Sequence, residues 1–85
     1  MGYRIVYTHR ALKDIQRLDP HVKQRLRATL ERYCESPFDY ATRLASPELG
    51  TYRFRIGDYR VIFDVRGTDL VVLRIGHRRD IYRGT

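Results

Sequence analysis

The side chains best suited to chemistry in this sequence are arginines gathered around one short turn. Arg53 and Arg55 precede the turn at Gly57–Asp58, and Arg60 follows it. If this turn is a two-residue hairpin loop, the three arginines fall on one face of the hairpin, away from the core. Like charges opposite one another destabilise a strand pair by roughly 0.2–1 kcal/mol, so an anionic ligand explains them better than stability does. The alternative is three solvated arginines whose stems cover the apolar Ile62.

Groups that could transfer a proton or bind a metal are sparse. The separated histidines His9, His21 and His77 and the single Cys34 give no metal-ligand spacing, so no metal or other cofactor is expected. The acids are also separated, which argues against a paired-carboxylate site. His77 lies in the basic C-terminal segment, and imidazole is a side-chain group whose unperturbed pKa suits proton transfer. Its alternative role is that of a hydrogen-bonded turn histidine.

The composition indicates one small, basic, globular domain over residues 1–85. The chain is 42% hydrophobic and 12% aromatic, which is enough to fold around a core. The net charge of +7, carried mostly by fifteen arginines, points to nucleic acid or an acidic protein segment as partner, with plain solubility as the alternative. A lone cysteine excludes an intramolecular disulfide and fits a reducing compartment. The longest aliphatic run, Leu70–Leu73, is far too short to span a membrane, and no signal-like stretch opens the chain. A cytosolic protein without membrane contact is therefore expected.

A short strand followed by a helical hairpin is predicted for the first part of the chain. Residues 3–7 alternate as a strand does. Thr8 caps the first helix, and Asp19 followed by Pro20 begins the second. The expected core positions are Tyr3, Ile5 and Tyr7, then Ala11, Leu12, Ile15 and Leu18, then Val22, Leu26, Leu30 and Tyr33, with Cys34 as a packed thiol.

An irregular crossing and a hairpin follow the helices. The crossing is predicted to run from Pro37 to Gly50, to hold Pro47 and to be anchored by Phe38, Tyr40 and Leu44. Beyond it, residues 52–56 and 59–65 both alternate, which indicates two paired strands. The pairs expected across this hairpin are Ile56–Tyr59, Arg55–Arg60, Phe54–Val61 and Arg53–Ile62.

The last predicted strand runs from Leu70 to Ile75 and is apolar on both faces, as a central strand is. A three-residue loop at Gly67–Asp69 is preferred, because a two-residue loop would bury Arg74. The residues expected to face the core are Val71, Leu73 and Ile75, and those expected beside the arginines are Arg74, His77, Arg78 and Tyr82.

Two stretches resemble the C-terminal half of RelE-type toxins of bacterial toxin–antitoxin modules: YRFRIGDYRVIF, from Tyr52 to Phe63, and RIGHRRDIY, from Arg74 to Tyr82. The opening strand and helical hairpin also fit, so the resemblance to the RelE/ParE superfamily covers nearly the whole chain. It implies an α+β fold in which the N-terminal strand and helical hairpin pack on a curved, mainly antiparallel sheet of about four strands. Such toxins enter the ribosomal A site, cut the mRNA there and are neutralised by a cognate antitoxin.

The resemblance, carried over position by position, also implies residue roles. Arg53 and Arg55 match paired basic residues that are lysines in well-studied members, so a lysine that accepts a proton is not available here. A guanidinium does not give up its proton at pH 7. The resemblance makes Tyr82 the expected orienting or base group, which requires a pKa lowered by the neighbouring arginines, and His77 is expected to contribute to proton transfer. The expected catalytic residues are Arg60, Arg78, Tyr82 and His77, and the expected phosphate-binding residues are Arg53, Arg55, Arg74 and Arg79.

Three functions stay open at this point. The first is a ribosome-dependent mRNA endoribonuclease that inhibits translation through metal-independent attack of a 2′-hydroxyl on the phosphate of A-site mRNA. The others are a ParE-like inhibitor of DNA gyrase with the same fold and a non-catalytic basic module that binds nucleic acid. The arginines together with Tyr82 favour the nuclease, because a gyrase inhibitor needs no phosphate-activating cluster. The implied partners are the ribosome and a small acidic RelB-like antitoxin, in a hetero-oligomeric complex able to bind operator DNA through the antitoxin.

Overall fold

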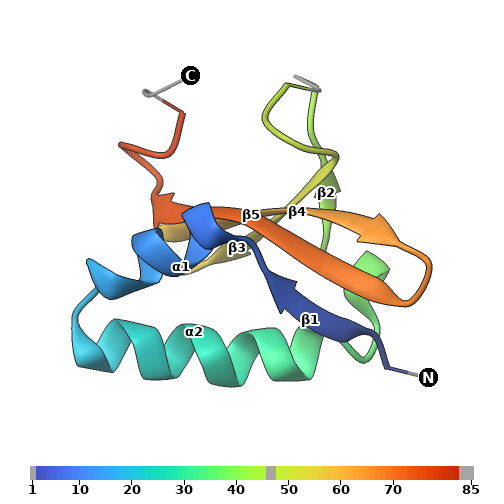
Figure 1. The fold of residues 1–85 in the computed structure, drawn as a ribbon, viewed down its shortest axis with the longest axis horizontal. Coiled ribbons are helices and arrows are strands. Elements are labelled where there is room, and N and C mark those ends of the chain that lie inside the picture. The colour runs from blue at the N-terminus through green and yellow to red at the C-terminus, as the bar shows by residue number, and fades with distance from the viewer. Residues whose placement is uncertain (1, 46–47, 83–85) are drawn as a thin grey trace.

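The computed structural model describes residues 2–45 and 48–82, and in it two helices cover one face of a five-stranded sheet (Figure 1). The helices are α1 (His9–Gln16) and α2 (Pro20–Tyr33), followed by a short 3-10 helix, η1 (Pro37–Asp39). The strands are β1 (Arg4–Tyr7), β2 (Thr42–Arg43), β3 (Tyr52–Ile56), β4 (Tyr59–Arg66) and β5 (Asp69–His77).

The strands lie in the order β1-β5-β4-β3-β2, with β1 parallel to β5 and the other neighbours antiparallel. This confirms the predicted α+β fold. The described part of the chain has five strands in place of about four, because β2 pairs with β3 over only two residues. A pair so short leaves no alternation that sequence patterns could reveal.

The start of the chain builds one side of the core as predicted. Tyr3, Ile5 and Tyr7 pack against the buried residues. Thr8 caps α1, since its Oγ1 accepts a hydrogen bond from the N–H of Ala11 at 3.2 Å. The first helix therefore begins where its capping residue indicates.

The core faces of α1 and α2 follow the predicted spacing with one exception. Ala11, Leu26 and Leu30 are buried, and the side chains that pack around them are Ile15, Leu18, Val22 and Tyr33. Leu12 is 46% exposed, so its assignment to the core was wrong. Ala11, Ile15 and Leu18 already form the stripe that meets the core, and Leu12 lies about 100° further round the helix. There it lines a groove of about 510 Å³ between the two helices.

The crossing after α2 is held by ring contacts more than by burial. Pro37 is buried, whereas Phe38 and Tyr40 are 52% and 46% exposed, which makes them weaker anchors than predicted. Tyr40 stacks on Tyr33 with ring centroids 3.9 Å apart. Pro47 lies outside the described residues.

The hairpin of β3 and β4 has the predicted register at every expected pair: Ile56–Tyr59, Arg55–Arg60, Phe54–Val61 and Arg53–Ile62. Gly57 takes the left-handed conformation, φ +59°, that a two-residue loop demands and that glycine adopts without strain. Phe54 and Val61 are fully buried in the core. The arginines of the hairpin therefore lie on the opposite face.

β5 occupies the central position that its two apolar faces predicted, with β1 on one side and β4 on the other. The loop before it has two residues, because Arg66 pairs with Asp69, so the predicted three-residue loop was wrong. With no further irregularity, this shorter loop would turn Arg74 towards the core.

A β-bulge in β5 removes that conflict. Arg74 pairs with Ile62, but Val72 pairs with Phe63, so Leu73 is an extra residue on the β5 side. The extra residue restores the face on which Arg74 was expected. The core residues of β5 are consequently Leu70, Val72 and Ile75, which confirms Ile75 and corrects the prediction for Val71 and Leu73.

Candidate functional site

Five of the predicted residues come together on the face of the sheet away from the helices, and we call them the arginine cluster: Arg53, Arg55, Arg60, Arg78 and Tyr82. The first two belong to β3, the third to β4, and the last two follow β5. Residues 78–82, after β5, and the described residues between β2 and β3 both extend beyond the sheet on this side (Figure 1). The cluster is therefore built by the hairpin and by the turn that follows the central strand.

Arg60 is the buried member of the cluster, with 6% of its surface exposed. Its Nη1 donates hydrogen bonds to the carbonyl oxygens of Gly57, at 3.0 Å, and Tyr59, at 2.9 Å. A buried charge is costly unless its polar atoms are satisfied, and here backbone carbonyls supply part of that satisfaction. The hairpin turn thus holds this guanidinium in one place.

The neighbouring charges of the cluster shift the pKa of Arg60. Burial lowers the pKa of the Arg60 guanidinium from its ordinary value, and the positive charge of Arg55 lowers it further. Arg53 and Arg78 act in the same direction, whereas Tyr82 acts in the opposite one. Among residues 2–45 and 48–82, no carboxylate lies within ion-pair distance of Arg53, Arg55 or Arg60. The cluster therefore keeps an excess of positive charge suited to an anion.

Arg53 joins β3 to the C-terminal turn. Its Nη1 donates a hydrogen bond of 2.8 Å to the hydroxyl oxygen of Tyr82. The Nε of Arg53 is buried and has no hydrogen-bond partner among the described residues. Tyr82 is thus oriented by a cation whose own donors are not all used.

Arg78 lies at the β3–β4 turn. Its N–H donates to the carbonyl oxygen of Asp58 at 2.7 Å, and its Nε is 3.7 Å from the Asp58 carboxylate. Its side chain is 54% exposed, so the guanidinium faces solvent. The backbone hydrogen bond to Asp58 thus fixes the main chain of Arg78, while its guanidinium stays accessible to solvent.

The apolar Ile62 on this face does not need arginine stems to cover it. Ile62 is fully buried, and Gly50 lies against it with φ +149°. A Cβ on Gly50 would come within 2.6 Å of Ile62 Cγ2 and 2.9 Å of Leu73 Cδ1. Because the chain itself covers Ile62, the covering role gives no reason for three clustered arginines.

His77 and Arg79 are not brought into the cluster. His77 pairs with Tyr59, which packs against the core on the helix side, and the two rings meet edge to face with centroids 5.5 Å apart. The Nδ1 of His77 accepts a hydrogen bond from the N–H of Arg79 at 3.1 Å. These are the contacts of a turn histidine. Arg79 is exposed beside it.

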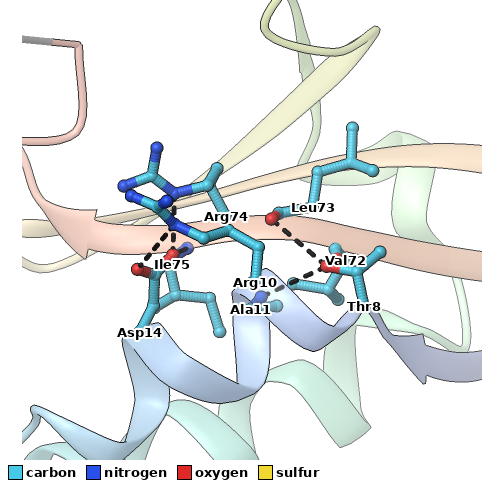
Figure 2. Close-up of polar contacts among 8 residues, drawn as sticks. All are labelled: Thr8, Arg10, Ala11, Asp14, Val72, Leu73, Arg74 and Ile75. Carbon is cyan, nitrogen blue, oxygen red and sulfur yellow. Dashed lines mark hydrogen bonds and ion pairs between the residues drawn. The ribbon is translucent and has the colours of Figure 1, made fainter. Parts of the chain in front are cut away.

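The side chain of Arg74 extends to α1, where it contacts Asp14, an acid that the sequence analysis did not single out. Its Nε donates to Asp14 Oδ2 at 2.8 Å (Figure 2). Asp14 is 8% exposed and lies beside the apolar stripe of α1, between Ala11 and Ile15. An acid so close to a core stripe was the available signal for a buried ionic contact.

Cys34 is a packed thiol, as predicted. It is buried, donates a hydrogen bond to the Glu31 carbonyl oxygen at 3.0 Å, and has a pKa raised by burial. In the described ranges, no three His, Cys, Asp or Glu side chains gather where a metal ion could be held. None of the helices in those ranges has the length and apolar character needed to cross a membrane.

Comparison with known proteins gives both a family and a fold. Residues 5–82 match the family described as the ParE toxin of the type II toxin–antitoxin system parDE. Toxin RelG of Mycobacterium tuberculosis is 33% identical to this chain, over 98% of this chain and 99% of its own length. The toxin–antitoxin complex RelBE2 of Mycobacterium tuberculosis has a TM-score of 0.84 at 25% identity, covering 94% of this chain and 95% of that one. A double arginine-to-alanine mutant of E. coli RelE in the free state has a TM-score of 0.77 at 26% identity, covering 96% and 92%.

Proposed function

This chain belongs to the ParE toxin family of type II toxin–antitoxin systems and is similar to RelE toxins, and from this premise we propose that it cuts mRNA in the ribosomal A site. The observation that carries the proposal is the arginine cluster. In it Arg53, Arg55 and Arg60 converge without an ion-paired carboxylate among the described residues. Such a cluster suits a substrate whose charge grows as it reacts.

The proposed reaction is attack by a ribose 2′-oxygen on the adjacent phosphorus. The bond from phosphorus to the 5′-oxygen breaks, so the products are a 2′,3′-cyclic phosphate and a free 5′-hydroxyl. The 2′-hydroxyl must lose a proton and the departing 5′-oxygen must gain one, while negative charge develops on the phosphate oxygens. The protein must therefore supply cations and a route for the proton.

The cations of the cluster divide by their setting. Arg60 is held by two carbonyl oxygens and needs no rearrangement to face a phosphate, whereas the exposed Arg78 would exchange its contact with the Asp58 carboxylate for one with the phosphate. We assign both to charge stabilisation in the transition state. Arg53 and Arg55 of β3 bind the RNA backbone on either side of the reacting phosphate.

Proton transfer is assigned to Tyr82, because no guanidinium can act as a base near pH 7. Its hydroxyl oxygen already accepts a hydrogen bond from Arg53 and can orient the 2′-hydroxyl or take its proton. His77 is the weaker candidate, since its Nδ1 is engaged by Arg79 and its ring lies against Tyr59.

The partner that neutralises the proposed toxin is a cognate acidic antitoxin. A solved relative, RelBE2, is a toxin–antitoxin complex, and the net charge of +7 suits an acidic segment laid over the arginine cluster. The described residues provide no carboxylate that masks Arg53, Arg55 or Arg60 from within.

Inhibition of DNA gyrase is the second candidate function, because the matched family is that of ParE toxins and the resemblance to ParE implies this activity. The two functions make different demands on the same face, because a gyrase inhibitor needs no phosphate-activating cations beside a proton-transfer group. The deciding experiment induces the chain in cells and follows mRNA cleavage during translation beside DNA supercoiling. Cleaved mRNA with unchanged supercoiling is expected. Changed supercoiling with intact mRNA would assign the chain to gyrase.

A further inference from the structure

Asp14 of α1 is a buried acid with three donors around it. Its side chain is 9% exposed, and Oδ2 accepts hydrogen bonds from the Nε of Arg74 at 2.8 Å and from the N–H of Ile75 at 3.0 Å. Arg10, one turn earlier, lies 3.7 Å from Oδ1 (Figure 2). A carboxylate taken out of water is tolerated only when paired and hydrogen-bonded in this way. Asp14 therefore has a structural role, which is to hold a neighbouring element in place.

The element that Asp14 holds is the end of β5. The pairing of β1 with β5 stops at Tyr7 and Val72, while β5 continues to His77. Beyond Val72 the backbone groups on this side of β5 have no strand beside them. The chain has turned into α1 there, and unpaired buried backbone groups are costly.

Thr8, which caps α1, and Asp14 of α1 take the place of the missing strand. The backbone N–H and the Oγ1 of Thr8 donate to the carbonyl oxygen of Val72, at 3.1 and 2.9 Å, and Asp14 accepts from the N–H of Ile75 (Figure 2). The bulge at Leu73 lies between these two contacts, where strand pairing is already disturbed. Thr8 and Asp14 together pin the bulged stretch from both ends.

The pinned stretch leads directly into the arginine cluster. Three residues after Ile75, the N–H of Arg78 bonds to the Asp58 carbonyl oxygen, and the turn that follows brings Tyr82 to Arg53. The end of β5 is also paired with β4, at Val61–Ile75, Arg60–Gly76 and Tyr59–His77, so Asp14 adds a second restraint, from the α1 side, on the segment that carries Arg78 and Tyr82 towards Arg60.

We propose that Asp14 is a positioning residue of the site: by holding the N–H of Ile75 it sets Arg78 and Tyr82 in register with Arg60. The inference rests on the proposed nuclease function for its consequence in catalysis. A misplacement of about 1 Å caused by a change away from the chemistry can cost a factor of about 10² in rate. Asp14 touches no substrate and acts only through β5.

The experiment compares two substitutions at Asp14 with a matched control at the other end of the same strand. Asp14→Ala removes the acceptor. Asp14→Asn keeps an oxygen that can occupy the place of Oδ2 and directs its amide group towards the exposed Arg10. Asp69→Asn is the control, because Asp69 also ties β5 to another element through an arginine Nε, that of Arg4, at 3.1 Å.

The measurements are single-turnover cleavage on programmed ribosomes, ribosome concentration at half-maximal rate, Ile75 amide exchange and the NMR signals of the Tyr82 ring. For Asp14→Ala we expect a rate lower by about 10²-fold, an unchanged half-saturating concentration, faster amide exchange and shifted Tyr82 signals. Asp14→Asn should restore most of the rate, and Asp69→Asn should match the wild type throughout.

The inference is overturned if folded Asp14→Ala cuts at the wild-type rate, or if Asp14→Asn is as slow as Asp14→Ala. Should Asp14→Ala not fold, Asp14→Leu combined with Arg74→Met removes the acceptor with apolar filling, an exchange that buried ion pairs often tolerate. If wild-type protein cuts no mRNA, the nuclease proposal fails by itself. Unchanged Ile75 exchange and Tyr82 signals in the substituted protein would still refute positioning by Asp14.

Discussion

Arg60 and Arg78 both place a guanidinium group in the site, one buried and the other exposed. Arg60 is buried and held by carbonyl oxygens of its own hairpin, so its charge is fixed before any substrate arrives. The Arg78 side chain is 54% exposed, and its Nε lies 3.7 Å from the Asp58 carboxylate. A donor already held in place costs no reorganisation during the reaction, whereas Arg78 has to leave Asp58 to reach the developing charge. We therefore expect Arg78 to be the better target for separating catalysis from folding.

Arg78→Ala should lower the single-turnover rate of mRNA cleavage on programmed ribosomes by about 10²–10³-fold, because it removes one donor to the developing charge. Arg66→Ala is the matched control, since Arg66 is exposed at the far end of β4. That variant should cut at the wild-type rate and change stability by less than about 0.5 kcal/mol. Thermal melting establishes that both variants fold. Equal rates for the two would remove Arg78 from the site.

Tyr82→Phe should also slow cleavage, by about 10²-fold or more if the hydroxyl handles the proton. The change removes the oxygen that accepts from Arg53 and keeps the ring. Loss of one hydrogen bond should cost about 0.5–1.5 kcal/mol in unfolding free energy. Tyr40→Phe is the control, because that ring is half exposed and stacked on Tyr33 outside the cluster. Retained activity in Tyr82→Phe would transfer the proton role to His77 or to the ribosome.

At the scale of elements, the β3–β4 turn does more than reverse the chain. The carbonyl oxygen of Gly57 accepts from Arg60, and that of Asp58 accepts from the N–H of Arg78. The turn thus sets two cations at once. Gly67 occupies the other two-residue loop with the same φ of +59° and has no heavy atom within 4 Å of an added Cβ.

This pair of glycines gives a prediction about the turn. Gly57→Ala and Gly67→Ala should each destabilise the fold by about 1–2 kcal/mol, because a Cβ disfavours left-handed backbone. At Gly57 the Cβ would also lie 3.0 Å from Arg25 Nη2, the far end of a flexible side chain that can give way. Only Gly57→Ala should slow cleavage, since only its loop holds the arginine cluster. Urea unfolding measures the first effect and single-turnover cleavage the second. An equal loss of activity in both variants would mean that stability, and not the turn, limits the reaction.

Local signals in the sequence were enough for the hairpin and for three of the cluster arginines. The Gly57–Asp58 turn and the alternation around it determine the register, which places Arg53, Arg55 and Arg60 on one face. The bulge at Leu73 was beyond such signals. It arises because β5 must satisfy β4, β1 and α1 together, and no local pattern reports those neighbours.

The same limit applies to the residues that the cluster does not gather. Arg74 was expected beside the other arginines, but its guanidinium is bound by Asp14 of α1, sixty residues away in the chain. His77 sits at the end of β5, where one step of the strand decides the face on which it falls. Both outcomes depend on tertiary packing, as does the pair at β2 that added a fifth strand.

At the scale of the whole molecule, the site has cations in excess and little to align its substrate. Correct alignment of a nucleophile with its target can be worth about 7–11 kcal/mol. We expect the ribosome to supply that alignment, so purified protein should cut mRNA on programmed ribosomes far faster than free RNA of the same sequence. Comparable rates on the two substrates would show that the protein orients RNA alone.

The net charge of the molecule predicts how it is restrained. Coexpression with the small acidic protein encoded beside it should restore growth to cells in which this chain alone arrests it, and the two should copurify. A partly disordered acidic segment that folds over the cluster would give this complex both attraction and coverage. Growth arrest that persists despite confirmed expression of the partner would contradict this prediction, as would a chain that is harmless by itself.

Arg55 and Arg60 lie directly opposite each other across the hairpin. Their repulsion also affects how long a gene of this kind goes on encoding an active protein. A neutral residue in place of Arg55 relieves the repulsion and raises the free energy of unfolding by roughly 0.2–1 kcal/mol. Selection for folding and selection for toxicity therefore act on this position in opposite directions. Copies that escape the second kind of selection are expected to lose these arginines early, and the harmless descendants to be more heat-resistant than the toxin from which they arose.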